Sequence, residues 1–225
     1  MKAIQFSIIR TLFSKIFLGF LITIFATFAP MQVTWAQTET ASVDQALETY
    51  RQGNYQSAIE EFNQAIAADR EPEKAYFYRG VSYLQLAEWE KAIADYTQVL
   101  DLNENNAGAY YNRGIAHTQK GNYEQAVADY TQALELEPNQ ETIYFNRGIV
   151  YTQQGNLESA IADYSQAIEL NSELAEAYAN RGVTYAAMGE KESAIADLET
   201  AAQMYQERGN QQLYQTVQES LEKLE

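Results

Sequence analysis

The sequence predicts an all-α protein, a solenoid of stacked helix pairs, and three observations lead to this fold class. The motif Tyr-x-Asn-Arg-Gly begins at Tyr110 and returns after 34 and 68 residues, and a close variant begins at Tyr76. The motif Ala-(Ile or Val)-Ala-Asp begins at Ala92 and recurs with the same 34-residue period. Apolar residues within each copy follow the spacing of amphipathic helices. A fixed period of this length indicates a repeat array.

Each repeat is expected to contain two helices separated by a tight turn. In the copy at 107–140, periodicity predicts helices over about 108–120 and 123–137. Gly121 lies between them, where a residue in the left-handed region would end the first helix. Pro138 follows the second helix and prevents its continuation.

Small and aromatic residues recur at fixed places in these copies. In the central copy they are Tyr110, Gly114, His117, Gly121, Tyr123, Ala126, Tyr130, Ala133 and Pro138. This pattern resembles the tetratricopeptide repeat, a helix–turn–helix unit of 34 residues. The resemblance covers about three quarters of the chain and implies a right-handed superhelical solenoid of five repeats. The repeats are drawn at 39–72, 73–106, 107–140, 141–174 and 175–208, with the array at 43–208. The first copy is weaker, because Gln45 and Ala46 replace its Arg-Gly pair.

The last segment, 209–225, departs from the repeat. Leu213, Val217, Leu221 and Leu224 form one apolar stripe of a predicted single helix. We expect this helix to cap the fifth repeat, since the terminal units of solenoids need a polar outer face. The alternative is a dimerisation helix, through which the protein would form a homodimer.

The N-terminal segment, 1–36, is predicted to be a signal peptide. It has basic residues and no acidic ones, and an apolar run of 14 residues ends before Pro30. That run is short for a bilayer span, and small residues at Thr34 and Ala36 precede Gln37. Cleavage would leave a mature tail at 37–42 and place the protein outside the cytoplasm, in the periplasm or secreted. The alternative is an uncleaved membrane anchor.

Composition excludes several classes of function. The chain has no cysteine and one histidine, so we expect no metal site and no cofactor. The formal net charge is −16, and removal of 1–36, which carries three of the 15 basic residues, leaves 12 basic and 31 acidic side chains, or −19. Because such a charge repels phosphate backbones, no nucleic-acid partner is expected.

An arginine within each of the four strong repeats precedes an aspartate by 16 residues. A guanidinium next to the packing stripe requires an anionic partner, so structural ion pairs between the two helices are expected. The four pairs are Arg79 and Asp95, Arg113 and Asp129, Arg147 and Asp163, and Arg181 and Asp197.

The resemblance implies that the first helix of each repeat lines an inner groove that binds a protein or peptide. The side chains expected to face this groove are Phe77, Val81, Leu84, Tyr111, Asn112, Ile115, Gln119, Phe145, Asn146, Ile149 and Gln153. Amides can pair with a peptide backbone, and apolar residues can hold its side chains. The alternative is that much of this stripe packs against the next helix.

The predicted function is a non-enzymatic scaffold for protein–protein interaction in the cell envelope or periplasm. No nucleophile and base stand at a catalytic spacing, so no catalytic residue is assigned. The alternatives are a membrane-anchored assembly factor and a regulatory subunit of an envelope enzyme. Capture of a peptide C-terminus is not supported, because only Lys74 and Asn112 occupy places that clamp a carboxylate in the family that the sequence resembles.

Overall fold

The computed structural model describes residues 42–224, and within this range the regular structure is entirely α-helical. Contacts divide the chain into the units Met1–Thr40 and Ala41–Glu225, and all the described helices belong to the second. The helices are α2 Val43–Arg51, α3 Tyr55–Ala67, α4 Pro72–Gln85, α5 Trp89–Leu102, α6 Ala107–Gln119, α7 Tyr123–Leu136, α8 Glu141–Gln153, α9 Leu157–Leu170, α10 Ala175–Met188, α11 Lys191–Glu207 and α12 Gln211–Glu222. The predicted signal peptide, 1–36, lies outside the described residues.

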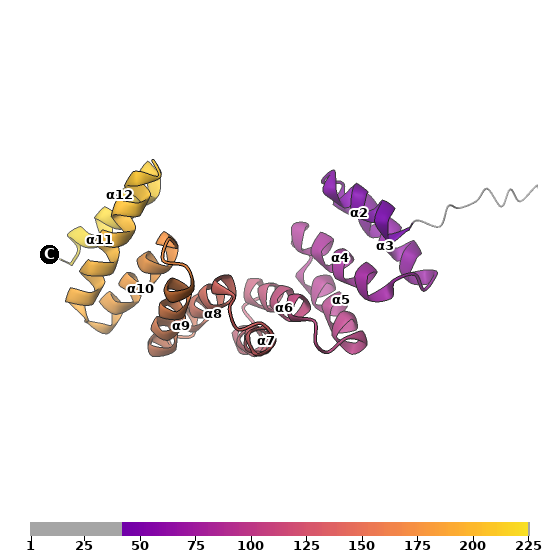
Figure 1. Ribbon diagram of the computed structural model, residues 1–225, viewed down its shortest axis with the longest axis horizontal. Helices are drawn as coiled ribbons and strands as arrows, with labels where there is room; N and C mark the ends of the chain where they lie inside the picture. Colours follow the sequence, from indigo (N-terminus) through magenta and orange to yellow (C-terminus); the bar gives the residue numbers. More distant parts are fainter. Residues whose placement is uncertain (1–41, 225) are drawn as a thin grey trace, which may run out of the picture. The chain divides into compact units, whose positions relative to one another are not determined.

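The described helices form five consecutive pairs followed by a single helix. Each pair joins two helices that contact each other, from α2 with α3 to α10 with α11, and each pair also contacts the next along the chain (Figure 1). This arrangement confirms the predicted all-α repeat solenoid. It also confirms ten repeat helices plus a terminal helix within 42–224.

The first helix of each repeat ends in the same hydrogen-bonded turn. After α6, Gly121 has φ +76°, and its N–H donates to the carbonyl of Thr118 at 3.0 Å. The N–H of Asn122 donates to the carbonyl of His117 at 2.9 Å. These two bonds define a Schellman ending, which requires a left-handed residue at the glycine position. The turn therefore reverses the chain at the same point in each 34-residue unit.

A second glycine allows the two helices of a repeat to approach closely. A Cβ atom placed on Gly114 would lie 2.7 Å from the ring of Tyr130, and one on Gly148 would lie 2.7 Å from the ring of Tyr164. Both tyrosine side chains are almost fully buried. The glycine thus supplies the space that the aromatic ring of the second helix fills.

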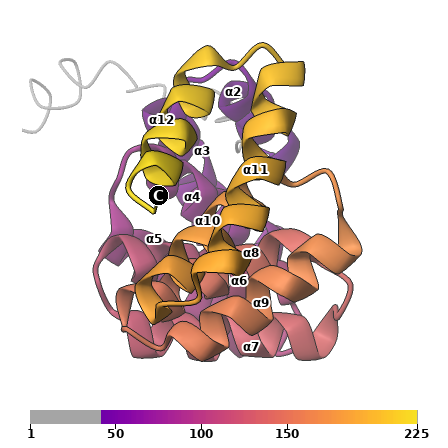
Figure 2. The same ribbon diagram turned by 90° about the vertical axis from the view of Figure 1, so that its left-hand side faces the viewer.

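Helix α12 packs alongside α11 at the C-terminal end of the array (Figure 2). Val217 is buried in a cluster with Tyr205, and Tyr214, Leu221 and Leu224 pack against that cluster. Leu213, the remaining aliphatic residue of the predicted stripe, is 37% exposed. The stripe is therefore divided between the interior and an open surface.

Candidate functional site

The first helices of successive repeats, α4, α6, α8 and α10, lie side by side and form one surface, here called the A-face. Residues of the terminal helix α12 adjoin it at the C-terminal end. A Cβ atom on Gly108 of α6 would lie 3.4 Å from the ring of Phe77 on α4. The Nδ2 of Asn146 on α8 donates a hydrogen bond to the hydroxyl of Tyr111 on α6 at 3.0 Å. The side chains predicted to line a groove thus adjoin one another from repeat to repeat.

None of the predicted groove residues is fully buried. Gln119 and Gln153 are exposed, and the remaining nine are partly buried. Three of the rings also rest on buried tyrosines of the second helices: the centroid distances are 5.7 Å for Phe77 with Tyr96, 6.0 Å for Tyr111 with Tyr130, and 5.9 Å for Phe145 with Tyr164. The stripe therefore packs on the core with one side and faces solvent with the other.

Asparagine side chains run beside this stripe at the same place in three repeats. Asn146 donates to Tyr111. Asn112 and Asn180 make no side-chain hydrogen bond with any residue in the described range, and both are partly buried. Their amides are free to donate and accept along the A-face.

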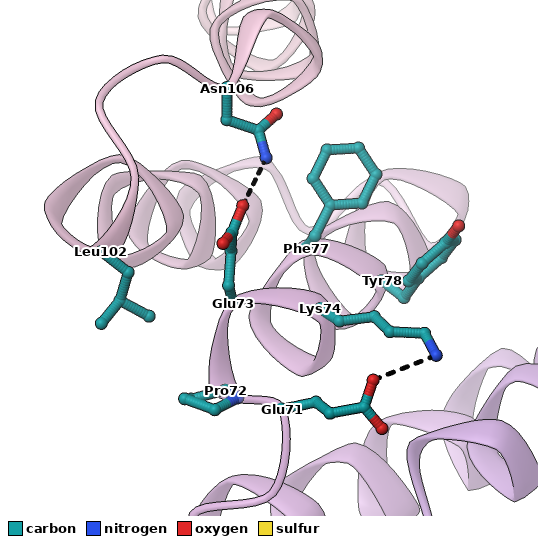
Figure 3. A pocket seen from close by; sticks show the side chains of 8 residues that line it. All are labelled: Glu71, Pro72, Glu73, Lys74, Phe77, Tyr78, Leu102 and Asn106. Carbon is teal, nitrogen blue, oxygen red and sulfur yellow. Dashed lines mark hydrogen bonds and ion pairs between the residues drawn. The ribbon is translucent and has the colours of Figure 1, made fainter.

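A cavity of about 720 Å³ opens at the beginning of α4, near the end of α5 and the beginning of α6 (Figure 3). Its lining residues are Glu71, Pro72, Glu73, Lys74, Phe77, Tyr78, Leu102 and Asn106. The Nζ of Lys74 donates to Asp44 at 3.0 Å and to Glu71 at 3.3 Å, and these hydrogen bonds raise the pKa of Lys74. The cavity thus combines aromatic rings with carboxylates, and its lysine is already paired.

A second cavity, of about 290 Å³, lies where α8, α10, α11 and α12 meet. Phe145, Val183, Leu213 and Val217 supply apolar walls, and Glu176 is a charged residue of the lining. Val183 is 51% exposed. Leu213 of the terminal helix therefore contributes to this cavity beside the A-face.

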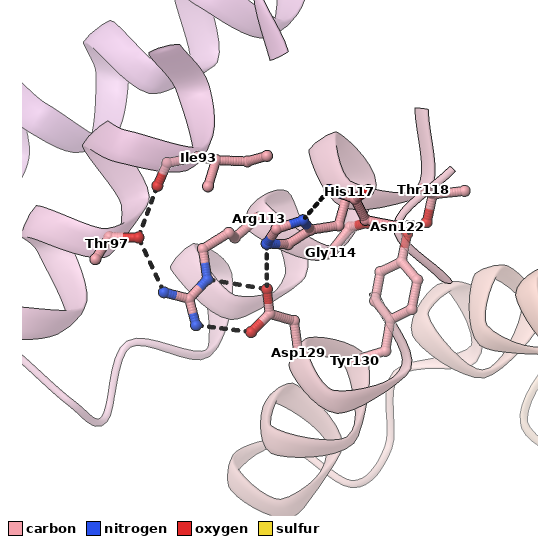
Figure 4. A network of polar contacts seen from close by, with 9 residues as sticks. All are labelled: Ile93, Thr97, Arg113, Gly114, His117, Thr118, Asn122, Asp129 and Tyr130. Atoms are coloured by element: carbon pink, nitrogen blue, oxygen red, sulfur yellow. Dashed lines mark hydrogen bonds and ion pairs between the residues drawn. The ribbon is translucent and has the colours of Figure 1, made fainter. Parts of the chain in front are cut away.

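Each predicted arginine contacts the aspartate 16 residues later and also reaches the preceding repeat. The Nε and Nη2 of Arg113 donate to the two carboxylate oxygens of Asp129 at 2.9 and 2.7 Å (Figure 4). Its Nη1 donates to the hydroxyl of Thr97 on α5 at 3.1 Å. The Thr97 hydroxyl in turn donates to the carbonyl of Ile93 at 2.8 Å. One guanidinium therefore connects three helices from two repeats.

The same geometry recurs in the other three repeats. The bidentate pairs are Arg79 with Asp95, Arg147 with Asp163, and Arg181 with Asp197, and the third acceptors are Asn63, Thr131 and Ser165. Burial alone would lower the pKa of Arg113, but its bonds to Asp129 and the charge of that carboxylate raise it. These arginines are consequently charged, paired and structural.

The third acceptor was missed by the sequence reasoning, although the sequence carries a signal for it. A short polar residue stands 16 residues before each arginine, at the same place in successive repeats. The stacking of the arginines on tyrosines was also missed. The guanidinium carbon of Arg147 lies 5.7 Å from the ring centre of Tyr144 and 5.8 Å from that of Tyr151.

His117 occupies the place that a tyrosine takes in three other repeats. Its side chain is 14% exposed, and its Nε2 lies 3.9 Å from a carboxylate oxygen of Asp129 (Figure 4). Burial lowers the pKa of His117; the charge of Asp129 opposes this shift, and that of Arg113 adds to it. The imidazole is thus mainly neutral at pH 7 and acts as a packing residue.

Between residues 42 and 224, no group of three or more histidine or acidic side chains is placed to hold a metal ion. None of the helices in that range has both the length and the apolar character that a bilayer span requires.

Comparison with family models identifies the repeats. A model described as TPR repeat matches residues 83–121, 116–155 and 149–189. A model described as tetratricopeptide repeat matches residues 175–208. Together the matches extend over 83–208, which is more than half of the chain. No curated protein matches the chain.

Solved structures share the fold at low sequence identity. A crystal structure of MamA has a TM-score of 0.71 and 21% identity, and the match covers 73% of this chain and 96% of that one. For MamA from residue 41 to its end, from Desulfovibrio magneticus RS-1, the values are 0.67 and 17%, with 75% and 94% covered. YrrB, described as a TPR protein with an unusual peptide-binding site, has a TM-score of 0.66 and 22% identity, with 72% and 84% covered.

Proposed function

Because this chain belongs to the tetratricopeptide repeat family, we propose that it is a non-enzymatic scaffold that binds a segment of another protein on its A-face. The observation that carries the proposal is the row of partly exposed apolar side chains flanked by unpaired amides. Phe77, Tyr111 and Phe145 occupy the same place in three successive repeats. Exposed apolar surface of this kind marks interaction sites on soluble proteins. Asn112 and Asn180 would pair with the backbone of the bound segment.

The description of YrrB supports segment binding as the class of function, since that protein of similar fold is described as having an unusual peptide-binding site. The A-face offers two features that a bound segment needs. Its rings are held in place by contact with buried tyrosines, so little side-chain conformational entropy is lost on binding. Its two cavities provide places for side chains of the segment.

We further propose that the scaffold works outside the cytoplasm after cleavage of residues 1–36. This part of the proposal rests on the sequence of the N-terminal segment, with its basic start, short apolar run and small residues before Gln37. The acidic net charge of the mature chain suits basic or neutral partners.

Amide-to-alanine variants test the binding surface with little disturbance of the fold. Asn112→Ala combined with Asn180→Ala removes amides that have no hydrogen-bond partner in the described range. The free energy of unfolding should therefore stay within about 0.5 kcal/mol of that of the unmodified protein. Capture of partner proteins from an envelope extract should fall by roughly tenfold, because two backbone hydrogen bonds are lost. The readout is quantitative mass spectrometry of the captured proteins.

The matched control removes two amides elsewhere. Gln56 and Gln125 are exposed on second helices, and no hydrogen bond of their side chains is found in the described range. The double variant Gln56→Ala, Gln125→Ala should capture the same proteins as the unmodified chain. Replacement of Phe77, Tyr111 and Phe145 by serine should abolish capture, with a loss of stability because each ring also packs on a tyrosine. Full capture by folded forms of both A-face variants would exclude this surface.

A further inference from the structure

We propose that the cavity beside Phe77 receives a lysine or arginine side chain of the bound segment, so that the A-face selects basic segments with apolar neighbours. This inference rests on the proposed function and specifies the chemistry of the partner.

The walls of the cavity suit a long aliphatic side chain. Phe77 and Pro72 supply apolar surface, and Leu102 at the end of α5 is 55% exposed, the largest value among the exposed large hydrophobic residues between 42 and 224. Lysine and arginine bury their methylene stems along such surfaces while their charged ends remain in polar surroundings. The apolar floor thus provides contact for the stem.

The charges of the cavity suit the cationic end of that side chain. Oε1 of Glu73 accepts hydrogen bonds from Nδ2 of Asn103 and of Asn106, both at 2.9 Å, and these bonds fix the carboxylate in place. Its Oε2 has no hydrogen-bond partner in the described range. The aromatic rings of Phe77 and Tyr78 add a favourable surface for a cation (Figure 3).

Lys74, the basic residue that lines the cavity, does not form an ion pair with Glu73. Lys74 is held by Asp44 and Glu71, which together carry two negative charges. With Glu73 included, these four side chains have a net charge of −2 at neutral pH. A carboxylate or phosphate would be repelled here, whereas an incoming ammonium or guanidinium would be attracted and hydrogen-bonded.

A position without a side chain adjoins the Phe77 ring in this repeat. Gly108 stands next to the ring, and the corresponding places in the other strong repeats carry Lys74, Thr142 and Glu176. A Cβ atom on Gly108 would lie at an ordinary contact distance of 3.4 Å from the ring. A glutamine side chain can therefore be introduced at this position, next to the ring, without strain at its Cβ atom.

The second cavity presents a similar combination of groups. Phe145 occupies the repeat position of Phe77, and Glu176 lies in the same cavity. No basic residue lines this cavity. Both openings on the A-face thus place a carboxylate beside a phenylalanine, which agrees with a bound segment that is basic rather than acidic.

The test uses three capped dodecapeptides as probes, at about 0.15 M salt to screen non-specific attraction. One repeats Ser-Ala-Leu-Lys three times, and the other two carry glutamine or glutamate in place of lysine. The lysine peptide should bind the full chain more tightly than the glutamine peptide, and the glutamate peptide should not bind. Fluorescence anisotropy of labelled peptides measures the three dissociation constants.

Two variants locate the effect in the cavity. Glu73→Gln keeps an oxygen for Asn103 and Asn106 but removes the charge, so affinity for the lysine peptide should fall roughly tenfold. Gly108→Gln places a side chain next to Phe77 and should reduce the affinity for the lysine peptide at least as much as Glu73→Gln does. Thermal melting verifies that the variant is folded. Glu60→Gln, at an exposed position on α3, makes the same change of charge and should leave affinity unchanged.

Equal binding of the lysine and glutamine peptides would overturn the inference. Equal losses of affinity for the lysine peptide in Glu73→Gln and Glu60→Gln would also overturn it, because the attraction of the peptide would then come from the overall charge of the protein. The natural partner separates this inference from the proposed function. If capture of that partner is lost in Asn112→Ala, Asn180→Ala but unchanged in Glu73→Gln and Gly108→Gln, the A-face is the binding surface and the cation pocket is wrong.

Discussion

At the residue scale, one buried hydroxyl distinguishes the second repeat from its neighbours. Tyr130 shares a hydrogen bond of 3.2 Å with Thr118, and Tyr164 shares one of 3.1 Å with Thr152. The hydroxyl of Tyr96 is buried without a hydrogen-bond partner. The reason is visible in the sequence, because Leu84 occupies the place of the two threonines. Burial accordingly raises the pKa of Tyr96 well above its ordinary value.

We expect Tyr96→Phe to stabilise the protein by about 1 kcal/mol, because the variant removes a buried polar atom that has no partner. The matched change Tyr130→Phe should destabilise by about 1 kcal/mol, because a hydrogen bond is lost. Urea denaturation followed by circular dichroism measures both changes in the free energy of unfolding. A loss of stability in Tyr96→Phe comparable to that in Tyr130→Phe would show that the Tyr96 hydroxyl is satisfied in solution.

At the element scale, the turn after α4 departs from the turns of the other repeats. It has the same Schellman bonds, from Ala87 to the carbonyl of Leu84 at 3.1 Å and from Glu88 to that of Tyr83 at 2.9 Å. Ala87 has φ +57°, whereas the corresponding residue in the four other repeats is glycine. An L-residue in the left-handed region costs roughly 1–2 kcal/mol. This turn therefore contains strain that its neighbours lack.

Ala87→Gly should consequently stabilise the array by about 0.5–1 kcal/mol, because relief of the strain exceeds the entropy that glycine adds to the unfolded chain. Gly121→Ala should lower the free energy of unfolding by a similar or larger amount. A Cβ atom at this position would meet nothing within 4 Å, so this loss would come from the backbone conformation and not from a steric clash. Thermal unfolding of both variants compares the two turns. A destabilised Ala87→Gly variant would contradict the assignment of strain to this residue.

At the scale of the whole molecule, processing of the N-terminal segment decides where the scaffold acts. Cleavage before Gln37 would release the array, whereas an intact 1–36 segment would tether it to a membrane. We expect the native protein to have the mass of residues 37–225, measured by intact mass spectrometry of protein purified from its own cells. Replacement of Ala36 by a bulky residue such as phenylalanine should block cleavage and leave the longer form. A native protein that keeps 1–36 would instead favour the membrane-anchored assembly factor.

Homodimerisation through the terminal helix α12 is the alternative to its role as a cap. Val217 is buried within the protomer and Leu221 packs against the same cluster, so most of the predicted stripe of α12 is already used. The remaining aliphatic residue, Leu213, contributes to the cavity with Phe145. This use of the stripe favours a cap over a dimer interface.

The sequence by itself determined the repeat period, the order of the helices, the places of the turns and the partners of the arginines. These features are local or periodic. In the strong repeats, a glycine with a left-handed φ follows the first helix, except after α4. Arg113 and Asp129 are separated by the same 16 residues as the corresponding pairs in the other strong repeats. Periodicity also placed Phe77, Tyr111 and Phe145 on one side of the first helices, since residues 34 apart share a position in the unit.

Only the tertiary structure decided what lies between neighbouring repeats. It brought Thr97 to Arg113, Asn146 to Tyr111, and Gly108 to the ring of Phe77. It also left the Phe77 ring open beside Glu73, which the motif alone does not reveal. The physical reason is that repeat spacing specifies position along the chain, whereas contacts across repeats depend on how each helix pair rotates and packs against the next.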